Sequence, residues 1–232
     1  MKIGRRTVNA VRYVLEDLLP PALRDSPLFL GVMYLVWGRS APSFIAFRDR
    51  LRTMSADEYA SFYASITPIH GDCDLNRACV DRILAEVEGE AVLDAGCGRG
   101  RLAELIALGD PARSVTGADL APPEGKWPTN LGFVEGWLGR LPFPDKAFDT
   151  VVCTHTLEHI LDIDGAVADL RRLARRRLIL VVPRERESRY PLNLHVHFFP
   201  YVHTFLNRIR APDGRFACEI LEGDIYYREE MA

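Results

Sequence analysis

Apolar residues recur along the chain with two different spacings, and the spacing changes near residue 70. In the first segment they lie three or four residues apart, as on one face of a helix. The first such series is Val8, Val11, Leu15, Leu18 and Leu19. An apolar run over 27–37 predicts a second helix, and a capping-box pattern from Ser55 to Glu58 predicts another helix start. We therefore expect residues 1–70 to form a helical lid segment.

From residue 91 onward, short β-runs alternate with helical stretches. The β-runs cover 91–96, 114–119, 131–136, 148–153 and 177–183, and the helical patterns include 101–108 and 165–176. The tail over 215–229 predicts two further strands that turn at Glu222 and Gly223. Strands that alternate with helices predict a parallel sheet with ligands at the strand C-termini. We therefore expect residues 71–232 to form an α/β domain with a doubly wound, mostly parallel, seven-stranded Rossmann-like sheet.

The motif VLDAGCGRGRLAELIA at 92–107 indicates a ligand site. A predicted strand carries Asp94 near its end, and a glycine-rich turn then leads into a helix whose first N–H groups suit a carboxylate or a phosphate. The glycines of this turn are Gly96, Gly98 and Gly100. Arg101 breaks the Gly-x-Gly-x-x-Gly spacing of a dinucleotide site, and no P-loop lysine follows. Asp119, at the end of the second strand, has the place of an acid that accepts both hydroxyls of a ribose.

Four segments in this order resemble a known family, the class I S-adenosylmethionine-dependent methyltransferases. The segments are LDAGCGRG (93–100), GADL (117–120), LPFPDKAFDTVVCTHTLEHI (141–160) and RRLARRRLILVVP (171–183). The likeness is to the small-molecule group typified by ubiquinone and menaquinone methyltransferases. It implies a Rossmann-like fold and S-adenosylmethionine as the cofactor.

The resemblance also implies which residues hold the cofactor. The three glycines of the turn would line its methionine moiety, and Asp94 would hold the ammonium group. Asp119 would bind the ribose diol, and Leu120 would pack on the adenine. Trp137 and Leu138 stand where the family often has an acid and a small residue at the adenine edge, so Trp137 departs from the pattern.

Candidate catalytic residues follow the fourth predicted strand. By the same resemblance, Thr154 would lie beside the methyl group. An alcohol acceptor must lose its proton, and histidine is the usual base near neutral pH. We predict that His155 is this base, with a wall of the acceptor site as the alternative. His159 is a second candidate, although its Leu-Glu-His triplet favours a structural role. A divalent metal such as Mg²⁺ could instead activate the hydroxyl, although no ligand spacing in the sequence demands a metal.

Polar and aromatic residues after the fifth strand predict the acceptor site. Tyr190, Asn193, His195 and His197 are the expected acceptor contacts. Aromatic and hydrogen-bonding groups together favour a hydroxyl of a small molecule, and we expect a sugar or a glycosylated acceptor. The alternatives are C- or N-methylation of a quinone or natural product, RNA or protein methylation, and a non-catalytic cofactor-binding protein.

Composition and charge limit the partners and the cellular compartment that we expect for the protein. The net charge of -3 and the pI of about 6.1 argue against a nucleic-acid partner. Five cysteines without a C-x-x-C pattern favour a reducing cytoplasm, and no signal peptide is expected at the N-terminus. The apolar run over 27–37 is too short to cross a bilayer, so we expect no transmembrane segment. This run is predicted to be core, a homodimer interface or a membrane-facing surface.

Overall fold

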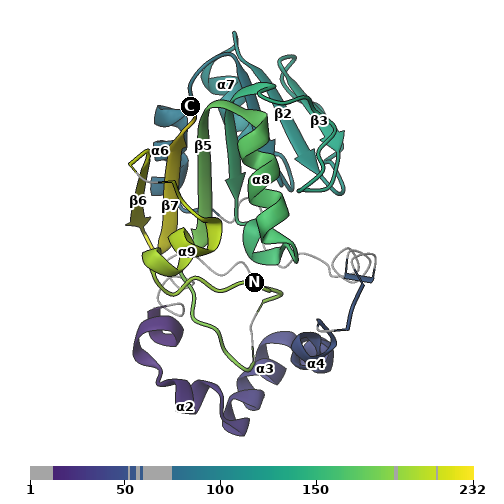
Figure 1. Ribbon diagram of the computed structural model, residues 1–232. Helices are drawn as coiled ribbons and strands as arrows, with labels where there is room; N and C mark the ends of the chain where they lie inside the picture. Colours follow the sequence, from purple (N-terminus) through teal and green to yellow (C-terminus); the bar gives the residue numbers. More distant parts are fainter. Residues whose placement is uncertain (1–12, 52, 56–57, 60–74, 191–192, 213) are drawn as a thin grey trace. The chain divides into compact units, whose positions relative to one another are not determined.

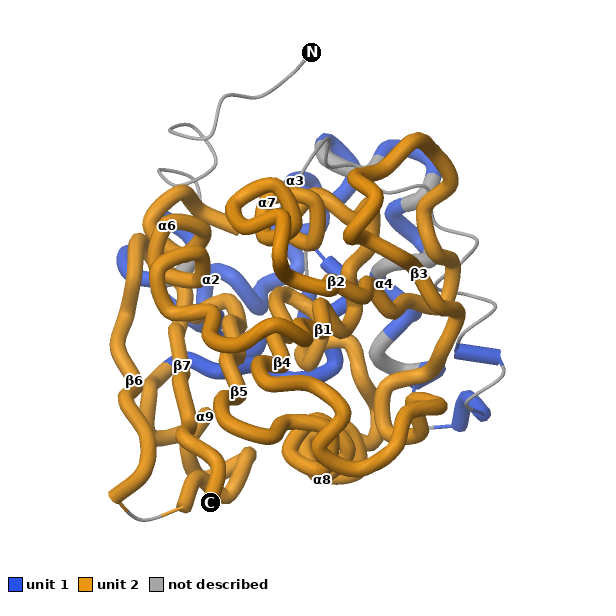
Figure 2. The backbone as a smooth tube through the Cα atoms, turned by 90° about the horizontal axis from the view of Figure 1, so that it is seen from above, with its two compact units in different colours: residues 1–68, 185–200 blue, residues 69–184, 201–232 orange. Residues whose placement is uncertain are grey.

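The computed structural model describes residues 13–51, 53–55, 58–59, 75–190, 193–212 and 214–232, and the chain forms two compact units (Figure 2). Unit 1 comprises residues 1–68 and 185–200, and unit 2 comprises residues 69–184 and 201–232. The division near residue 70 thus has a counterpart, but unit 1 also takes in residues 185–200, which the sequence analysis assigned to the later domain.

Unit 2 contains the predicted seven-stranded sheet, with the strand order β3-β2-β1-β4-β5-β7-β6 (Figure 1). The strands are β1 (Ala91–Ala95), β2 (Ser114–Asp119), β3 (Leu131–Glu135), β4 (Phe148–Thr154), β5 (Ala174–Pro183), β6 (Phe216–Leu221) and β7 (Asp224–Glu230). Strands β1 to β5 are parallel, and β7 pairs antiparallel with both β5 and β6. The doubly wound, mostly parallel α/β fold is therefore confirmed.

Helices cover both faces of this sheet (Figures 1 and 2). One face is covered by α6 (Arg77–Glu86) and α7 (Arg101–Gly109), and the other by α8 (Ile163–Leu173) and α9 (Val202–Ile209). The core under α6 and α7 is built from aliphatic side chains that are almost fully buried. Its members include Ile83, Val92, Ile106, Val115, Val152 and Ile179. Because both faces are covered, β4 and β5 are buried over most of their length, and the buried part of β5 includes the apolar run over 178–183.

The helix expected over 165–176 differs from the observed α8. Asp162 caps the helix, since its side chain accepts a hydrogen bond from the N–H of Gly165, and the helix ends at Leu173. The following arginines belong to β5, where Arg177 lies opposite Glu230 of β7 in the strand register. Cross-strand pairing therefore extends the strand into a sequence whose composition suits a helix end. No helix is predicted from the sequence at the position of α9.

The N-terminal part of unit 1 is largely helical where the structure describes it. Its elements are a π-helical turn (Val14–Leu18), α2 (Pro21–Arg24), 3₁₀ turns at Pro27–Phe29 and Gly38–Ser40, α3 (Leu30–Trp37) and α4 (Ala41–Leu51). The predicted helix over 27–37 is confirmed, and so is the capping box. The N–H of Ser55 donates to Glu58 Oε2 at 2.8 Å, and the N–H of Glu58 donates to Ser55 Oγ at 3.2 Å. Expectations for residues 1–12 and 60–74 lie outside the described residues.

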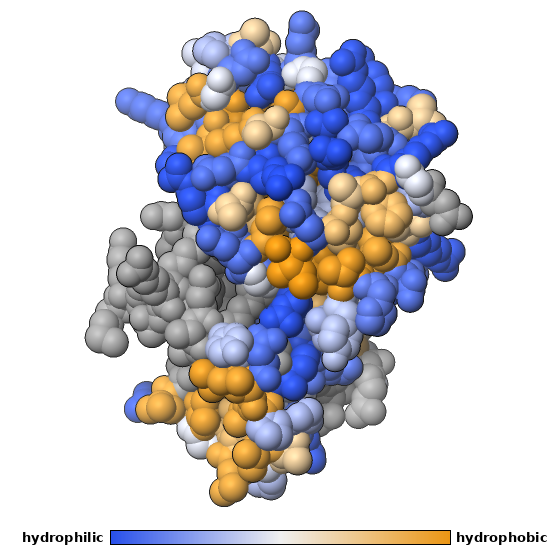
Figure 3. All heavy atoms as spheres, turned by 90° about the vertical axis from the view of Figure 1, so that its left-hand side faces the viewer, coloured by the Kyte–Doolittle hydropathy of each residue, from blue (hydrophilic) through white to orange (hydrophobic). Residues whose placement is uncertain are grey.

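Helix α3 and the turn before it divide their apolar residues between interior and surface. Phe29 and Met33 are buried, whereas Leu28 is 82% and Leu35 is 87% exposed. Figure 3 shows apolar side chains of this kind on the surface of unit 1. Within the part of the chain that the structure describes, no helix combines the length and the apolar character that a membrane span needs.

Candidate cofactor-binding and active site

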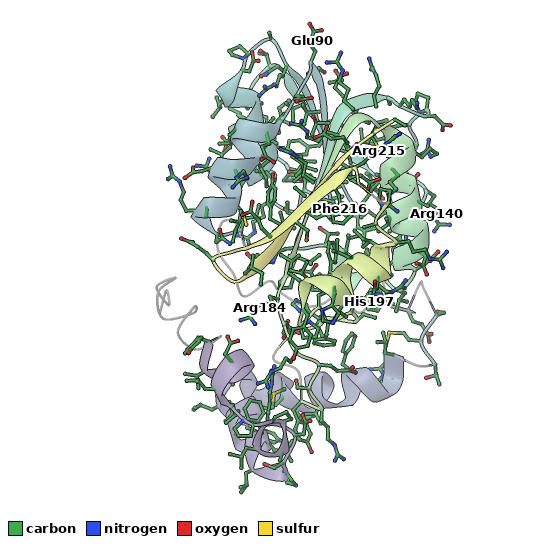
Figure 4. The ribbon with its side chains drawn as sticks, turned by 60° about the vertical axis from the view of Figure 1, so that its left-hand side comes forward. Glu90, Arg140, Arg184, His197, Arg215 and Phe216 are labelled. Carbon is green, nitrogen blue, oxygen red and sulfur yellow. The ribbon has the colours of Figure 1, made fainter. Side chains whose placement is uncertain are left out.

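The predicted cofactor residues of unit 2 gather at the C-terminal edge of its sheet. Figure 4 marks the two edges, because Glu90 precedes β1 at one edge and Arg184 follows β5 at the other. The glycine-rich turn after β1 lies against the end of β2. The N–H groups of Gly96 and Cys97 donate to the carbonyl of Ala118, at 2.7 and 3.1 Å. The turn is thus held by the neighbouring strand before α7 begins.

Glycine is needed at the three positions of this turn for different physical reasons. All three have positive φ, at 76° for Gly96, 51° for Gly98 and 74° for Gly100. A Cβ on Gly96 would lie 2.3 Å from Thr156 Oγ1, and one on Gly100 would lie 2.6 Å from a ring carbon of Phe133. A Cβ on Gly98 would meet nothing within 4 Å. Packing therefore requires two of the glycines, while the tip at Gly98 leaves its backbone open to a ligand.

Asp94 is the most unusual polar residue of this edge. Its side chain is 1% exposed, and Oδ2 has no hydrogen-bond partner among the described residues. Burial raises the pKa of Asp94, a hydrogen bond from the backbone of Ala103 lowers it, and the charge of Asp119 raises it by a smaller amount, so that the resulting pKa is about 7. A buried carboxylate with an unmet acceptor is unfavourable by itself and becomes favourable when a cation is bound. Asp94 therefore fits an ammonium group of a ligand.

Asp119 closes the other side of the turn. Its Oδ2 accepts a hydrogen bond from the N–H of Gly98 at 2.8 Å, and its Oδ1 accepts one from the N–H of Ala121 at 3.3 Å. Each carboxylate oxygen retains a second lone pair, so these bonds orient the group without using up its capacity for two hydroxyls. Leu120 beside it is 43% exposed, although it is a large apolar residue. Such a surface fits the face of an aromatic base.

The remaining cofactor candidates lie around the same edge. Leu138 is buried, at 7% exposure, and Trp137 is partly exposed, with the guanidinium carbon of Arg140 at 6.0 Å from its ring centre. Thr154 ends β4, and its carbonyl accepts a hydrogen bond from Thr156 Oγ1 at 3.0 Å. The same hydroxyl lies 3.3 Å from the carbonyl of Gly96, so it links the end of β4 to the turn.

His155 lies at the same edge with its ring held by carboxylates. Its Nε2 is 3.2 Å from Asp224 Oδ2, and its Nδ1 is 3.7 Å from Glu158 Oε1. Both acids are buried, and Asn76 donates to Asp224 Oδ2 at 2.9 Å. A histidine between two acids has its ring orientation fixed and its positive charge stabilised, which suits the uptake of a proton.

His159 lies in the 3₁₀ turn Leu157–His159, where its N–H donates to the carbonyl of Thr156. The backbone of His159 therefore helps to close the turn after β4. Its side chain is partly exposed.

The predicted acceptor contacts all belong to unit 1. Asn193 Nδ2 donates to both carboxylate oxygens of Glu185 at 2.9 and 3.0 Å, and His195 Nδ1 lies 2.6 Å from Glu185 Oε2. Burial raises the pKa of Glu185, but the charge of His195 and the hydrogen bonds from His195 and Asn193 outweigh it, so the pKa lies below its usual value. The rings of His197 and Phe199 are stacked, with their centroids 6.5 Å apart. The side chain of Tyr190 is buried.

Several contributing residues escaped the sequence analysis. Asn76, Glu158, Thr156, Glu185 and Asp224 all contact a predicted residue or its turn. Thr156 and Glu158 follow His155 within three residues, so their closeness to His155 was predictable from the sequence. Asp224 is 69 positions from His155, and no local pattern links the two.

Comparison with known proteins agrees with this geometry. Residues 93–182 match the model of a methyltransferase domain family. A demethylmenaquinone methyltransferase of Thermus thermophilus is 30% identical over 139 residues, which are 55% of this chain and 62% of that protein. A ubiquinone biosynthesis O-methyltransferase of Chromobacterium violaceum is 36% identical over 112 residues, 43% of this chain and 46% of that protein.

A solved structure shares the fold. A SAM-dependent methyltransferase from Aquifex aeolicus superposes with a TM-score of 0.51 at 17% identity, covering 66% of this chain and 89% of that chain. The two curated relatives are matched over less than two thirds of their own lengths. Asp94 and the open tip at Gly98 fit S-adenosylmethionine, and the family match covers both. Residues 93–182 are therefore similar to a methyltransferase domain, and unit 2 has the fold of S-adenosylmethionine-dependent methyltransferases.

Proposed function

We propose that this protein transfers a methyl group from S-adenosylmethionine to a hydroxyl of a small molecule. The observation that carries the proposal is the edge formed by β1 and β2. There, a fully buried carboxylate oxygen of Asp94 has no partner among the described residues, and the backbone at Gly98 faces open space. A cationic amino acid moiety and an extended backbone contact would satisfy both features at once.

S-adenosylmethionine supplies an electrophilic methyl group when it is bound. Asp94 would hold its ammonium group, and Asp119 would accept hydrogen bonds from its ribose hydroxyls. Leu120 and Trp137 would cover the adenine, and Thr154 would line the site near the methyl group. Most of the rate enhancement would then come from positioning and from the exclusion of water.

His155 would act on the acceptor. As the hydroxyl oxygen forms its bond to the methyl carbon, its proton passes to the imidazole, and the electrons of the broken carbon–sulfur bond remain on sulfur. The carboxylates of Asp224 and Glu158 stabilise the positive charge that the ring acquires. A positioned base contributes about 10²–10⁴-fold to the rate. His155→Ala is therefore expected to lower turnover by about a hundredfold or more and to leave cofactor affinity within about threefold.

For the acceptor, the sequence favours a sugar or a glycosylated molecule, because aromatic and hydrogen-bonding residues follow β5. A phenolic hydroxyl is a second candidate with a specific observation behind it. The sugar prediction depended on the polar side chains of Asn193 and His195, and in the structure both side chains contact Glu185. The names of the two curated relatives concern menaquinone and ubiquinone. Methyl transfer to catechol and to methyl glucoside, compared side by side, distinguishes the two acceptor classes.

Cofactor binding is tested by Asp119→Asn. An amide keeps an oxygen for the N–H of Gly98 but loses the charge that strengthens the ribose bonds, by roughly 1.5–3 kcal/mol. We expect calorimetry to show at least about tenfold weaker binding of S-adenosylmethionine and of its demethylated product. Asp110→Asn is the matched control, because Asp110 also accepts a backbone N–H bond, from Ala112, at the other end of α7. Equal affinities for the wild type and Asp119→Asn would contradict the assignment.

A further inference from the structure

His155 has a left-handed backbone conformation, which is uncommon for a residue other than glycine. Its φ is 48°, in the left-handed region that non-glycine residues seldom adopt, and its N–H donates to the carbonyl of Val181 at 2.9 Å. A strained conformation of this kind persists only where the surroundings determine it, and such residues cluster at functional sites. The backbone strain at His155 therefore indicates that neighbouring residues hold this residue in place.

The ring is held by a buried acid from the far end of the chain. Asp224 begins β7 and lies opposite Pro183 at the end of β5, because the two strands are antiparallel. This register brings Asp224 to the same sheet edge as the ends of the parallel strands. Its Oδ2 lies 3.2 Å from Nε2 of His155, and the residue is 2% exposed.

Asp224 is itself fixed by a third residue. Asn76 is 3% exposed, and its Nδ2 donates to Asp224 Oδ2 at 2.9 Å and to the carbonyl of Leu221 at 2.8 Å. Its Oδ1 accepts the N–H of Cys79 and so caps α6. The start of a helix therefore holds the acid, and the acid holds the histidine.

We propose that Asp224 is the positioning residue of His155, with Asn76 as its anchor, and that together they select the tautomer in which Nε2 carries the proton. This inference rests on the proposed function in that it gives the base its orientation. An ionised carboxylate only accepts hydrogen bonds, so Nε2 must donate to Asp224. In the neutral ring Nδ1 is then the basic nitrogen. Proton uptake at Nδ1 places the new charge between Asp224 and Glu158.

The decisive experiment reads the tautomer of His155 in the cofactor-free full chain by ¹H–¹⁵N correlation of the imidazole nitrogens. We expect the Nε2–H tautomer in the wild type. Asp224→Asn has an amide that can donate to the ring, so we expect a shift to the Nδ1–H form or a mixture. Turnover of catechol or methyl glucoside should fall by about a hundredfold or more, with the affinity for S-adenosylmethionine within about threefold of the wild type.

Glu229→Gln is the matched control. Glu229 is a buried carboxylate on the same strand, with Arg171 and Tyr227 as its partners, so its loss should lower stability without changing the tautomer of His155. If Asp224→Asn does not fold, Asn76→Ser serves instead. Serine retains the helix cap but removes the donor to Asp224, and a smaller tautomer shift is expected.

An Nδ1–H tautomer in the wild type, or an unchanged tautomer in both Asp224→Asn and Asn76→Ser, would overturn the inference. Failure of the proposed function is distinguishable. It would appear as absent cofactor binding in the wild type, whereas the tautomer is measured without cofactor.

Discussion

Each unit of the molecule contains a buried carboxylate, and the two have opposite surroundings. Glu185 in unit 1 is 8% exposed and accepts hydrogen bonds from Asn193, with His195 and Arg24 also beside it. Asp94 in unit 2 is 1% exposed, and its Oδ2 has no partner among the described residues. The pKa of Glu185 lies below its usual value, whereas burial raises that of Asp94 to about 7.

The two carboxylates therefore differ in role: the charge of Glu185 stabilises the protein, whereas the charge of Asp94 fits a ligand. Glu185 has its compensating groups within the protein, so its ionised form stabilises the folded state. Asp94 has a hydrogen bond from the backbone of Ala103, but its Oδ2 has no partner among the described residues, so its ionised form costs stability until a cation is bound. The predicted acceptor residues Asn193 and His195 surround the first acid, and the predicted cofactor residues surround the second.

A large effect is expected on the stability of unit 1. Glu185→Gln removes the charge that His195 and Arg24 face, and breaking a buried pair in this way typically costs about 3 kcal/mol or more. Because the folded pKa of Glu185 is lowered, its contribution is present above the unfolded pKa and is lost as the pH falls through the folded pKa. Urea denaturation should show a large loss at pH 7 that shrinks below pH 4.5.

Glu187→Gln, on a neighbouring residue that is exposed, is the control for this measurement. A loss of similar size in both variants, or none in Glu185→Gln, would show that the cluster around Glu185 does not stabilise unit 1.

A smaller effect is expected for Gly98→Ala, which fills the open tip of the glycine turn. A side chain at a φ of 51° costs about 1–2 kcal/mol of stability, but no atom within 4 Å obstructs it. The protein should therefore fold, and the affinity for S-adenosylmethionine should fall by about tenfold, about 1.4 kcal/mol, because the methyl occupies ligand space. Calorimetry on the folded variant measures this.

Gly132→Ala provides the comparison, because its Cβ also meets nothing within 4 Å and it lies in β3. It should bind the cofactor as the wild type does. Unchanged affinity in Gly98→Ala would mean that no ligand approaches the tip of the turn.

A third effect concerns Asp94 and the stability of the protein without cofactor. Its folded pKa is raised to about 7 from 3.8, so the folded state binds more protons than the unfolded state between these values. Stability should therefore fall as the pH rises through this window. Asp94→Asn lacks this penalty and should be more stable than the wild type by as much as about 4 kcal/mol at pH 7. Urea denaturation should show the difference vanishing near pH 4, and a difference independent of pH would contradict the account.

Much of the cofactor edge was predictable because its parts are close in sequence. The turn after β1 and the end of β2 belong to adjacent parallel strands, so the predicted cofactor residues Gly98 and Asp119 lie at the same edge, where a 2.8 Å hydrogen bond joins them. The seven-stranded sheet followed from the alternation of strands and helices. Both expectations rest on local periodicity and on the known geometry of parallel sheets.

The contacts of His155 were not predictable in the same way. Asn76 and Asp224 are 148 positions apart, and they meet only because the antiparallel register of β7 on β5 brings Asp224 to the C-terminal edge. Glu185 lies two residues after the end of β5 but belongs to unit 1, as do its partners Arg24 and Asn193. Pairing across such distances depends on tertiary register, and single-sequence patterns do not encode it.

The central claim, that Asp94 awaits the cationic part of the cofactor, is tested most directly by proton release. Calorimetric titration of S-adenosylmethionine at pH 6, in two buffers of different ionisation enthalpy, reports the protons released on binding. Most Asp94 carboxyls are protonated at this pH, since their pKa is about 7, and an ammonium partner favours the ionised form. The account predicts release of about one proton by the wild type and almost none by Asp94→Asn, which should also bind more weakly. Tight binding by both proteins with the same proton count would contradict it.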